Sequence, residues 1–400
     1  MVIRIFKWFA GVLGVAALAL AMFLAWQWPF AVNLYRGLLA GPPGSGAPPP
    51  ADAANYYPAV ERVAGQPRPL PGADAARDEA RFADAIAYAD SMASFSFLVW
   101  HDGKLLVERY GNGGTAETRA ESASMHKSVM AMVVGYALAD GIIKSLDDPI
   151  GNYIAEWKGD PRGAISLRAF LTMSTGLTTT SAAGGPFSES VRFQTGLFPV
   201  GILLSREIQR PAGANFEYLN VNSNLMGLAL QRSLGKRYSE YLSEKIWRPL
   251  GAADSFVVPD RPGGYVKTSG SLLATPRDWL RLGIMLAGNG EIDGQRILPA
   301  GWLQQMLTPS ARNPRYGLQI WLSSPHVEQR YYNDFKAGLA VIEKAPFAAP
   351  DTFYFDGFGG QRVYVTPSEN LVIVRTGPAK IDWDDSAIPN MVLKAVRAPS

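Results

Sequence analysis

The pair Ser124 and Lys127 has the residue types and the spacing that nucleophilic chemistry needs. In a helix, residues three apart lie on the same face about one turn from each other, so the lysine amine can reach the serine hydroxyl. Apolar residues at three- and four-residue spacing run on to Asp140 and predict a helix whose first turn holds Ser124. Unpaired N–H groups at a helix N-terminus favour negative charge, which suits an oxyanion forming beside this serine.

Spacing alone is equally consistent with an ordinary capped core helix that carries a solvated lysine. A second pair, Ser233 and Lys236, has the same spacing but lies where a helix is expected to end, at Gly235, and we interpret it as chance. At its usual pKa of about 10.4 a lysine is protonated at neutral pH, so Lys127 needs burial or a charged neighbour to act as a base. His126 is expected to face another side of the helix, as a packing or surface residue.

A phenol and an amide lie two residues apart at Tyr218 and Asn220, just before an apolar helix that is expected from Leu225. A tyrosine close to the serine–lysine pair would supply a second group for moving the serine proton. The alternative is a buried tyrosine followed by a capping asparagine, which is an ordinary helix start.

The composition narrows the class of protein. The 400 residues, 48% of them hydrophobic, can bury the core of one large two-lobed domain or of two ordinary domains. The net charge of +3 is spread along the chain without a basic run, so nucleic acid is not an expected partner. With no cysteine, disulfides, thiolate metal sites and a cysteine nucleophile are excluded. The three histidines lie outside zinc and Ser-His-Asp motifs, and neither a metal nor a cofactor is expected.

The N-terminal residues 1–40 are predicted to be a membrane anchor. An apolar run from Trp8 to Trp28 follows Arg4 and Lys7, and about 20 such residues cover a hydrocarbon core of ~30 Å. A cleaved signal peptide is the alternative. The positive flank places the N-terminus in the cytoplasm and the catalytic domain outside it, on the periplasmic side of the inner membrane if the source is bacterial. Residues 41–56, rich in proline and glycine, are predicted to be a linker.

Residues 57–396 are expected to form one domain in which strands at the two ends enclose a helical middle, the lobe of about residues 141–265. Alternating and helical patterns predict strands at 96–100, 105–110, 316–322, 353–355, 362–366 and 371–375, and helices at 73–92, 124–140, 167–173 and 275–286. This order indicates an α+β fold, with an antiparallel sheet flanked by helices and an inserted helical lobe.

Taken together, these motifs resemble the serine β-lactamase and penicillin-binding-protein superfamily, in its class C-like branch. The resemblance is carried by the serine–lysine pair, by Tyr218 and Asn220, and by the stretches 145–150, 171–177 and 274–283 in the same order. The segment 316–321 is similar to the aminohexanoate-dimer hydrolases and related esterases. The resemblance implies a β-lactamase/transpeptidase-like fold in which Ser124, Lys127 and Tyr218 are catalytic and Asn220 orients the substrate or the lysine.

The third motif of this family is a Lys or His followed by Thr or Ser and then Gly, on a strand beside the site. Phe355, Asp356 and Gly357 match it best, because the similar segment 267–270 has an inserted residue and 375–377 ends a strand. A phenyl ring in place of a cation predicts poor recognition of carboxylates. Alternation along the strand predicts that Asp356 points away from the face of Phe355.

The resemblance also implies which groups meet the substrate. Phe355 and Gly357 would line the substrate site, and the backbone N–H groups of Ser124 and Phe358 would form the oxyanion hole. We therefore expect a serine hydrolase that cleaves a small ester, amide or peptide through an acyl-enzyme on Ser124 without a cofactor. The alternative is a non-catalytic extracytoplasmic binding or sensor domain that retains the fold, for which Phe355 is the best argument. The sequence makes no prediction of the oligomeric state.

Overall fold

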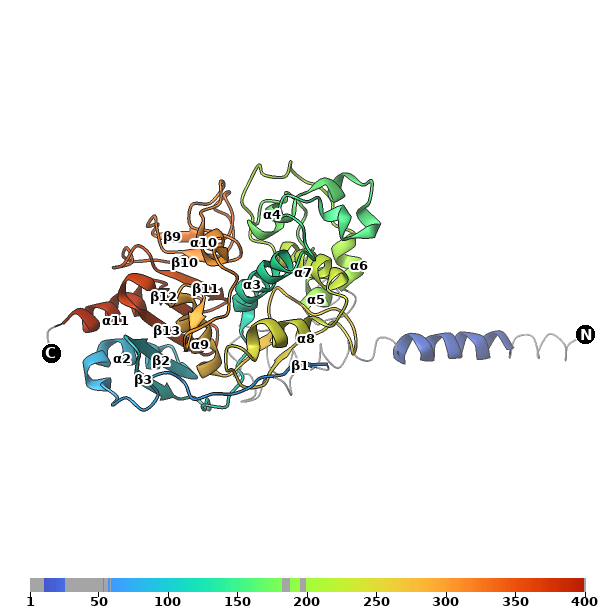
Figure 1. Cartoon of the computed structure of the whole chain (residues 1–400). Coiled ribbons are helices and arrows are strands. Elements are labelled where there is room, and N and C mark those ends of the chain that lie inside the picture. The colour runs from blue at the N-terminus through green and yellow to red at the C-terminus, as the bar shows by residue number, and fades with distance from the viewer. Residues whose placement is uncertain are drawn as a thin grey trace, which may run out of the picture.

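The computed structural model describes residues 11–25, 53, 57, 59–181, 188–194 and 199–398. A six-stranded antiparallel sheet in the order β3-β2-β13-β12-β11-β8 organises the domain (Figure 1). Its strands are β2 (Ser96–His101), β3 (Lys104–Tyr110), β8 (Trp321–Leu322), β11 (Phe353–Gly357), β12 (Gln361–Thr366) and β13 (Leu371–Thr376). Because β13 pairs with β2 along its whole length, strands from the two ends of the domain meet in one sheet.

Tight turns join the sheet's hairpins as the sequence predicts. Asp102 and Gly103, both with positive φ, connect β2 to β3, and left-handed turns of this kind match the twist of paired strands. Between β12 and β13 the chain makes a 3-10 turn (Pro367–Glu369) that ends at Asn370 in the left-handed region.

Helices cover both faces of the sheet. On one face α9 (Pro276–Ala287) packs against β12 and β13, and Gly283 allows this approach because a Cβ there would lie 2.3 Å from Val372 Cγ1. The start of α9 is fixed by a capping box between Thr275 and Asp278. On the other face lie α2 (Ala83–Ser91) and α11 (Ala387–Arg397), which bury apolar side chains against alternate residues of the same strands.

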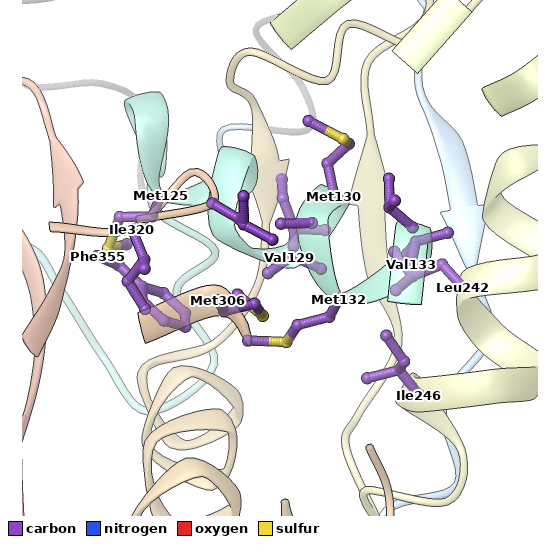
Figure 2. Close-up of a cluster of buried hydrophobic side chains, with 14 of the residues drawn as sticks. Met125, Val129, Met130, Met132, Val133, Leu242, Ile246, Met306, Ile320 and Phe355 are labelled. Carbon is purple, nitrogen blue, oxygen red and sulfur yellow. The ribbon is translucent and has the colours of Figure 1, made fainter. Parts of the chain in front are cut away.

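A helical lobe stands beside the sheet and contains α3 (His126–Ala139) and α7 (Asn220–Ser233), which lie side by side at its centre (Figure 1). Both are buried over most of their length, and their buried polar side chains include Lys127 of α3 and Asn224 of α7, which belong to the candidate site. Around them lie α4 (Leu167–Leu171), α5 (Glu189–Gln194), α6 (Pro199–Leu204), α8 (Tyr238–Leu242) and α10 (Trp302–Leu307). Figure 2 shows how α3 fills this core with methionine and valine side chains.

In the described part of the chain, three small antiparallel sheets lie outside the main sheet. They are the sheet β1-β4-β5 (Glu61–Val63, Ser255–Val257 and Leu272–Leu273), the pair β6 (Glu291–Ile292) and β7 (Gln295–Arg296), and the pair β9 (Gln329–Tyr331) and β10 (Ala340–Ile342). The predicted α+β architecture of sheet and helices is therefore confirmed.

Two predicted elements are shorter than expected. The helix expected over 73–92 is a 3-10 turn (Glu79–Phe82) followed by α2. The strand expected over 316–322 is reduced to β8, because Gln319 has φ of +58° and turns the chain before it enters the sheet.

The predicted membrane span falls only partly within the described residues. Residues 11–25 form a helix whose side chains are all exposed. Across the ranges that the structure describes, no helix combines the length and the apolar character needed to cross a bilayer, so the structure does not support the predicted transmembrane helix. Most of the predicted linker, residues 41–56, lies outside the described residues.

Candidate active site

The candidate nucleophile lies in a strained turn. Residues Ala123–Met125 form a 3-10 turn (η3) that leads into α3, and Ala123 has φ of +47°. A non-glycine residue in the left-handed region costs about 1–3 kcal/mol, and such strain is concentrated at functional sites. Gly270 accommodates the turn, because its Cβ position lies only 3.0 Å from the Ala123 carbonyl oxygen. The nucleophile is thus held just before the helix, in a 3-10 turn and not in the first turn of a regular helix.

Lys127 binds the nucleophile directly. Its Nζ donates hydrogen bonds to Ser124 Oγ at 2.7 Å, to Asn220 Oδ1 at 2.8 Å and to the Ser269 carbonyl oxygen at 2.7 Å. The lysine is 1% exposed, and burial lowers its pKa to about 7, while the negative charge of Asp356 partly opposes this shift. Near neutral pH the amine is therefore present in both its neutral and its protonated form, as a general base requires.

Tyr218 completes the group of three predicted catalytic residues. Its ring centroid lies 4.8 Å from Lys127 Nζ, and its phenol is close enough to the Ser124 hydroxyl for that group to affect the pKa of the phenol. Burial and the charge of Asp356 raise the pKa of the phenol well above 10, which outweighs the opposing effect of the serine. The tyrosine is thus a neutral phenol at physiological pH, suited to donate a proton and not to accept one as a phenolate.

Asn220 begins α7 and is solvent-exposed while its side chain holds Lys127. One turn later, Asn224 donates to Ser269 Oγ at 2.7 Å and so fixes the segment whose carbonyl binds the lysine. Neither Ser269 nor Asn224 was predicted as a site residue. The four-residue spacing of the two asparagines, which puts both on one helix face, is the signal that could have revealed the second one.

The segment 267–270, set aside in the sequence because of its inserted residue, contributes to the site through its main chain. Besides the Ser269 carbonyl, the Gly270 carbonyl oxygen lies 2.8 Å from His126 Nδ1. Tyr238 Oη lies 3.0 Å from the other ring nitrogen, and full burial lowers the histidine pKa to about 4. His126 is therefore neutral and packs between two segments, as predicted, without reaching Ser124.

The second serine–lysine pair does not form a site. Ser233 donates to the Ala229 carbonyl oxygen one turn earlier in α7, and Lys236 pairs with Glu244 on the surface. The prediction that this pair arises by chance is confirmed.

The predicted third motif lies beside the nucleophile at the end of β11. A Cβ on Gly357 would lie 2.4 Å from the Ser122 carbonyl oxygen, so only glycine lets the strand approach the η3 turn this closely. The turn that follows leads through Gly359 and Gly360, both with positive φ, to β12. Phe358, at the start of this turn, is 36% exposed. The backbone of Phe358 is therefore near Ser124, where an oxyanion hole is predicted.

Phe355 does not line the site. Its side chain is fully buried and meets Trp279 of α9 edge to face, with ring centroids 6.3 Å apart. Figure 2 shows it in the buried cluster that also contains Met125 and Ile320. A ring with no exposed surface cannot contact a substrate, so the predicted role of Phe355 in substrate binding is corrected to a role in the core.

Side chains alternate along β11, so Asp356 points to the face of the strand opposite Phe355, as predicted. The face of Asp356 is the one that is directed toward the candidate site. Its carboxylate accepts a hydrogen bond from Tyr332 Oη at 2.9 Å, and the Tyr332 ring lies 5.1 Å from the ring of Tyr218. Arg362 and Arg330 pair with this carboxylate at 2.7 and 3.2 Å. Asp356 is therefore paired and enclosed, and it acts on the catalytic pair through its electrostatic effect on Lys127 and through Tyr332.

A second carboxylate closes this buried network. Asp385 pairs with Arg330 at 2.8 Å and with Arg362 at 2.6 Å, so that two arginines and two aspartates alternate. All four side chains are at most 2% exposed. Such a network is stable only while it is complete, because loss of one partner leaves an uncompensated buried charge.

Within the described ranges, no three histidine, aspartate or glutamate side chains are grouped as metal ligands.

These features bring Ser124, Lys127 and Tyr218 together on a mixed sheet-and-helix fold, and comparison with known proteins identifies the family to which this fold belongs. The family model described as Beta-lactamase matches residues 79–376, which is most of the chain. The protein belongs to the beta-lactamase family.

Individual relatives have low sequence identity to this chain. A 6-aminohexanoate-dimer hydrolase of Paenarthrobacter ureafaciens is 26% identical over 230 residues, covering 54% of this chain and 58% of the relative. The D-alanyl-D-alanine-carboxypeptidase/endopeptidase AmpH of Escherichia coli K12 is 24% identical over 192 residues, covering 45% and 49%. The chain thus spans about half the length of the curated relatives it matches.

The solved structures agree on the fold. A protein from Bacillus anthracis, described as a candidate 6-aminohexanoate-dimer hydrolase, superposes with a TM-score of 0.68 at 21% identity, covering 85% of this chain and 90% of that one. An octameric penicillin-binding protein homologue from Pyrococcus abyssi gives a TM-score of 0.56 at 18% identity, covering 79% and 76%.

Proposed function

We propose that this protein is a serine hydrolase that cleaves ester or amide bonds through an acyl-enzyme on Ser124. The observation that carries the proposal is the 2.7 Å hydrogen bond from a buried Lys127, with a pKa of about 7, to the Ser124 hydroxyl. Membership of the beta-lactamase family supports it, as do relatives named as a hydrolase and as a carboxypeptidase/endopeptidase.

In the acylation step, neutral Lys127 takes the proton of Ser124 while Oγ forms a bond to the substrate carbonyl carbon. The carbonyl oxygen becomes negative and is held by the N–H groups of Ser124 and Phe358. Tyr218 then donates its phenolic proton to the leaving oxygen or nitrogen as that bond breaks. The protonated lysine restores the proton to the tyrosine, so the proton taken from the serine leaves with the first product.

Deacylation follows the same path in reverse. A water molecule attacks the acyl carbon and passes a proton to the Tyr218 oxygen as the phenol passes its own proton to neutral Lys127. The protonated lysine then gives this proton to Ser124, which leaves as the hydroxyl. Asn220 contributes in two ways, because its Oδ1 holds the lysine and its exposed position leaves the amide NH₂ as a donor for a substrate carbonyl.

The third motif favours neutral acyl groups. Position 355 carries a buried phenyl ring in place of a cation, and Asp356 is already paired with two arginines. A lost charge-assisted hydrogen bond costs about 1.5–3 kcal/mol, so substrates that carry a carboxylate, such as penicillins, are expected to be poorer by about 10- to 150-fold.

The direct test compares Ser124→Ala with Ser233→Ala, a control on a serine that has the same spacing to a lysine but lies outside the site. Short neutral esters and amides should be hydrolysed by the wild type and by the control, and Ser124→Ala should abolish turnover without unfolding the protein. Equal rates in Ser124→Ala would overturn the proposal. No turnover in the wild type would favour a non-catalytic binding domain.

We also propose that the N-terminal segment anchors the protein in a membrane, with the catalytic domain on the extracytoplasmic side. The support is the apolar run of the sequence from Trp8 to Trp28, which carries no charge and follows Arg4 and Lys7. The full chain should then remain with membranes after a high-salt wash, and a variant lacking residues 1–40 should be released. Release of the full chain by salt, or a mature N-terminus near Met22, would contradict the anchor.

A further inference from the structure

Exposed apolar side chains gather beside the candidate active site. Within the described residues 59–181, 188–194 and 199–398, large hydrophobic residues are exposed at six positions. Two of them, Val60 and Ile208, belong to other segments of the chain than the loops considered next. The remaining four are Phe335 (44% exposed), Leu339 (43%), Phe358 (36%) and Ile381 (75%), which we call the apolar rim.

The rim begins next to the nucleophile. Phe358 directly follows Gly357, the residue that touches the Ser122 backbone. The turn after Phe358 packs on the loop that follows β13, since the Lys380 N–H donates to the Gly359 carbonyl oxygen at 3.0 Å. Ile381, the next residue along, is thus brought close to Phe358.

The hairpin between β9 and β10 extends the rim. Ile342 of β10 forms a parallel bridge with Asp384, so the two segments run side by side in the same direction. Leu339 and Ile381 each precede this bridge by three residues, so both lie near the point where the two segments meet. The rim therefore runs from Phe358 through Ile381 toward Leu339.

The other end of the hairpin returns to the catalytic tyrosine. The Tyr218 N–H donates to the Tyr332 carbonyl oxygen at 2.8 Å, and Glu217 is bridged to Asn333. Phe335 follows two residues later, and its ring centroid lies 4.3 Å from the guanidinium carbon of Arg210. The loop 332–339 thus contacts the Tyr218 segment at its start, carries Phe335 near its middle and ends at Leu339.

We propose that the apolar rim binds a medium or long hydrocarbon chain in the acyl group of the substrate. This inference rests on the proposed serine hydrolase function and names the substrate class of that same site. Exposed apolar groups beside a reaction centre are stabilised when a substrate covers them. The buried Phe355, and Asp356 in ion pairs with two buried arginines, leave the third motif without an accessible charge for a polar acyl group. An uncharged chain is the partner that matches both features.

The effect of acyl chain length on kcat/KM can be estimated from the number of methylene groups that the rim covers. Complete burial of one methylene contributes about 0.8 kcal/mol, which is about a fourfold factor in an equilibrium constant. An open rim covers only part of each methylene, so kcat/KM should rise at least about tenfold from an acetyl to an octanoyl ester.

The experiment measures kcat/KM of the full chain on 4-nitrophenyl acetate, butyrate, hexanoate and octanoate below their micelle concentrations. The double variant Leu339→Ser, Ile381→Ser should lower the ratio of octanoate to acetate at least about fivefold. The control Val60→Ser, at an equally apolar exposed position outside the rim (37% exposed), should keep the ratio. A wild-type ratio near one, or a ratio unchanged in the double variant, would overturn the inference.

A second measurement covers the case in which the double variant is unstable. Rates of phosphonylation of wild-type Ser124 by ethyl- and octyl-chain fluorophosphonates report chain binding at the acylation step alone. Faster reaction of the octyl reagent supports binding of the chain by the apolar rim, and equal rates contradict it.

The results that would contradict the proposed function differ from those that would contradict the apolar rim. A protein that reacts with no ester and no phosphonate contradicts the serine hydrolase itself, whereas turnover of acetate with no preference for octanoate contradicts only the rim.

Discussion

Lys127 Nζ lies 2.7 Å from Ser124 Oγ, at a position where the lysine is almost completely excluded from water. Exclusion from water disfavours the ammonium form and lowers the lysine pKa to about 7, some three units below the ordinary value of about 10.4. The same residue would be an ineffective base on the surface, so the packing of α3 and α7 around it supplies much of its reactivity.

The pH dependence of acylation should follow this lysine. Only the neutral amine accepts a proton, so kcat/KM for a neutral ester should rise with pH through about 7 and then level off. Stability should change in the same direction, since between pH 7 and about 10.4 the unfolded chain binds more protons than the folded one. A pH–rate profile that is flat from pH 5.5 to 8.5 would contradict the assigned base.

Asp356→Asn should move that profile to lower pH. Its carboxylate raises the pKa of Lys127, and its removal also leaves Arg330 and Arg362 less compensated. Asp385→Asn is the matched control, because it breaks the same network without a direct effect on the lysine pKa. Both variants should lower the free energy of unfolding. Equal shifts of the profile in the two variants would show that the network acts only through stability.

Lys127→Ala and Tyr218→Phe should each slow acylation by roughly 10²–10⁴, the usual range for general acid–base groups. Because both move the same proton from Ser124, the double variant should lose much less than the two effects combined. Pre-steady-state release of 4-nitrophenol measures acylation separately from deacylation. Full additivity in log units would refute the shared proton path.

Gly357→Ala should reduce activity at least about 100-fold. The added Cβ would lie 2.4 Å from the Ser122 carbonyl oxygen, so the end of β11 must move away from the nucleophile turn and displace the Phe358 N–H. Gly201→Ala is the control, since no heavy atom lies within 4 Å of its Cβ position on α6. The comparison uses kcat/KM together with the thermal midpoint. Near wild-type activity in Gly357→Ala would contradict the proposed oxyanion hole.

Much of this site could be predicted from the sequence, because short spacings translate directly into geometry. Residues three apart at a helix start meet, and so Ser124 and Lys127 are in contact as expected. The sheet, its hairpin turns and α9 follow equally from local patterns, since alternation, turn residues and a capping box act over a few residues.

The errors concern contacts between distant segments. The sequence shows that Phe355 and Asp356 face opposite sides of β11. Which of the two sides is buried in the core depends on the packing of α9, which is distant in sequence. Likewise, main-chain groups carry no sequence signature, so the carbonyl of Ser269 that binds Lys127 could not be identified. The strand expected over 316–322 is shorter than predicted because Gln319 adopts positive φ, a conformation that cannot be predicted from a glutamine in the sequence.

The central claim is that Ser124 is a nucleophile activated by Lys127, and labelling with a small fluorophosphonate tests it most directly. The reagent needs no knowledge of the natural substrate and forms a stable bond only with an activated hydroxyl. Intact-mass and peptide mass spectrometry of the full chain should show one adduct, located on Ser124, that forms faster as pH rises through about 7 and is absent in Ser124→Ala. A wild-type protein that stays unlabelled, or that carries the adduct on another residue, would contradict the account.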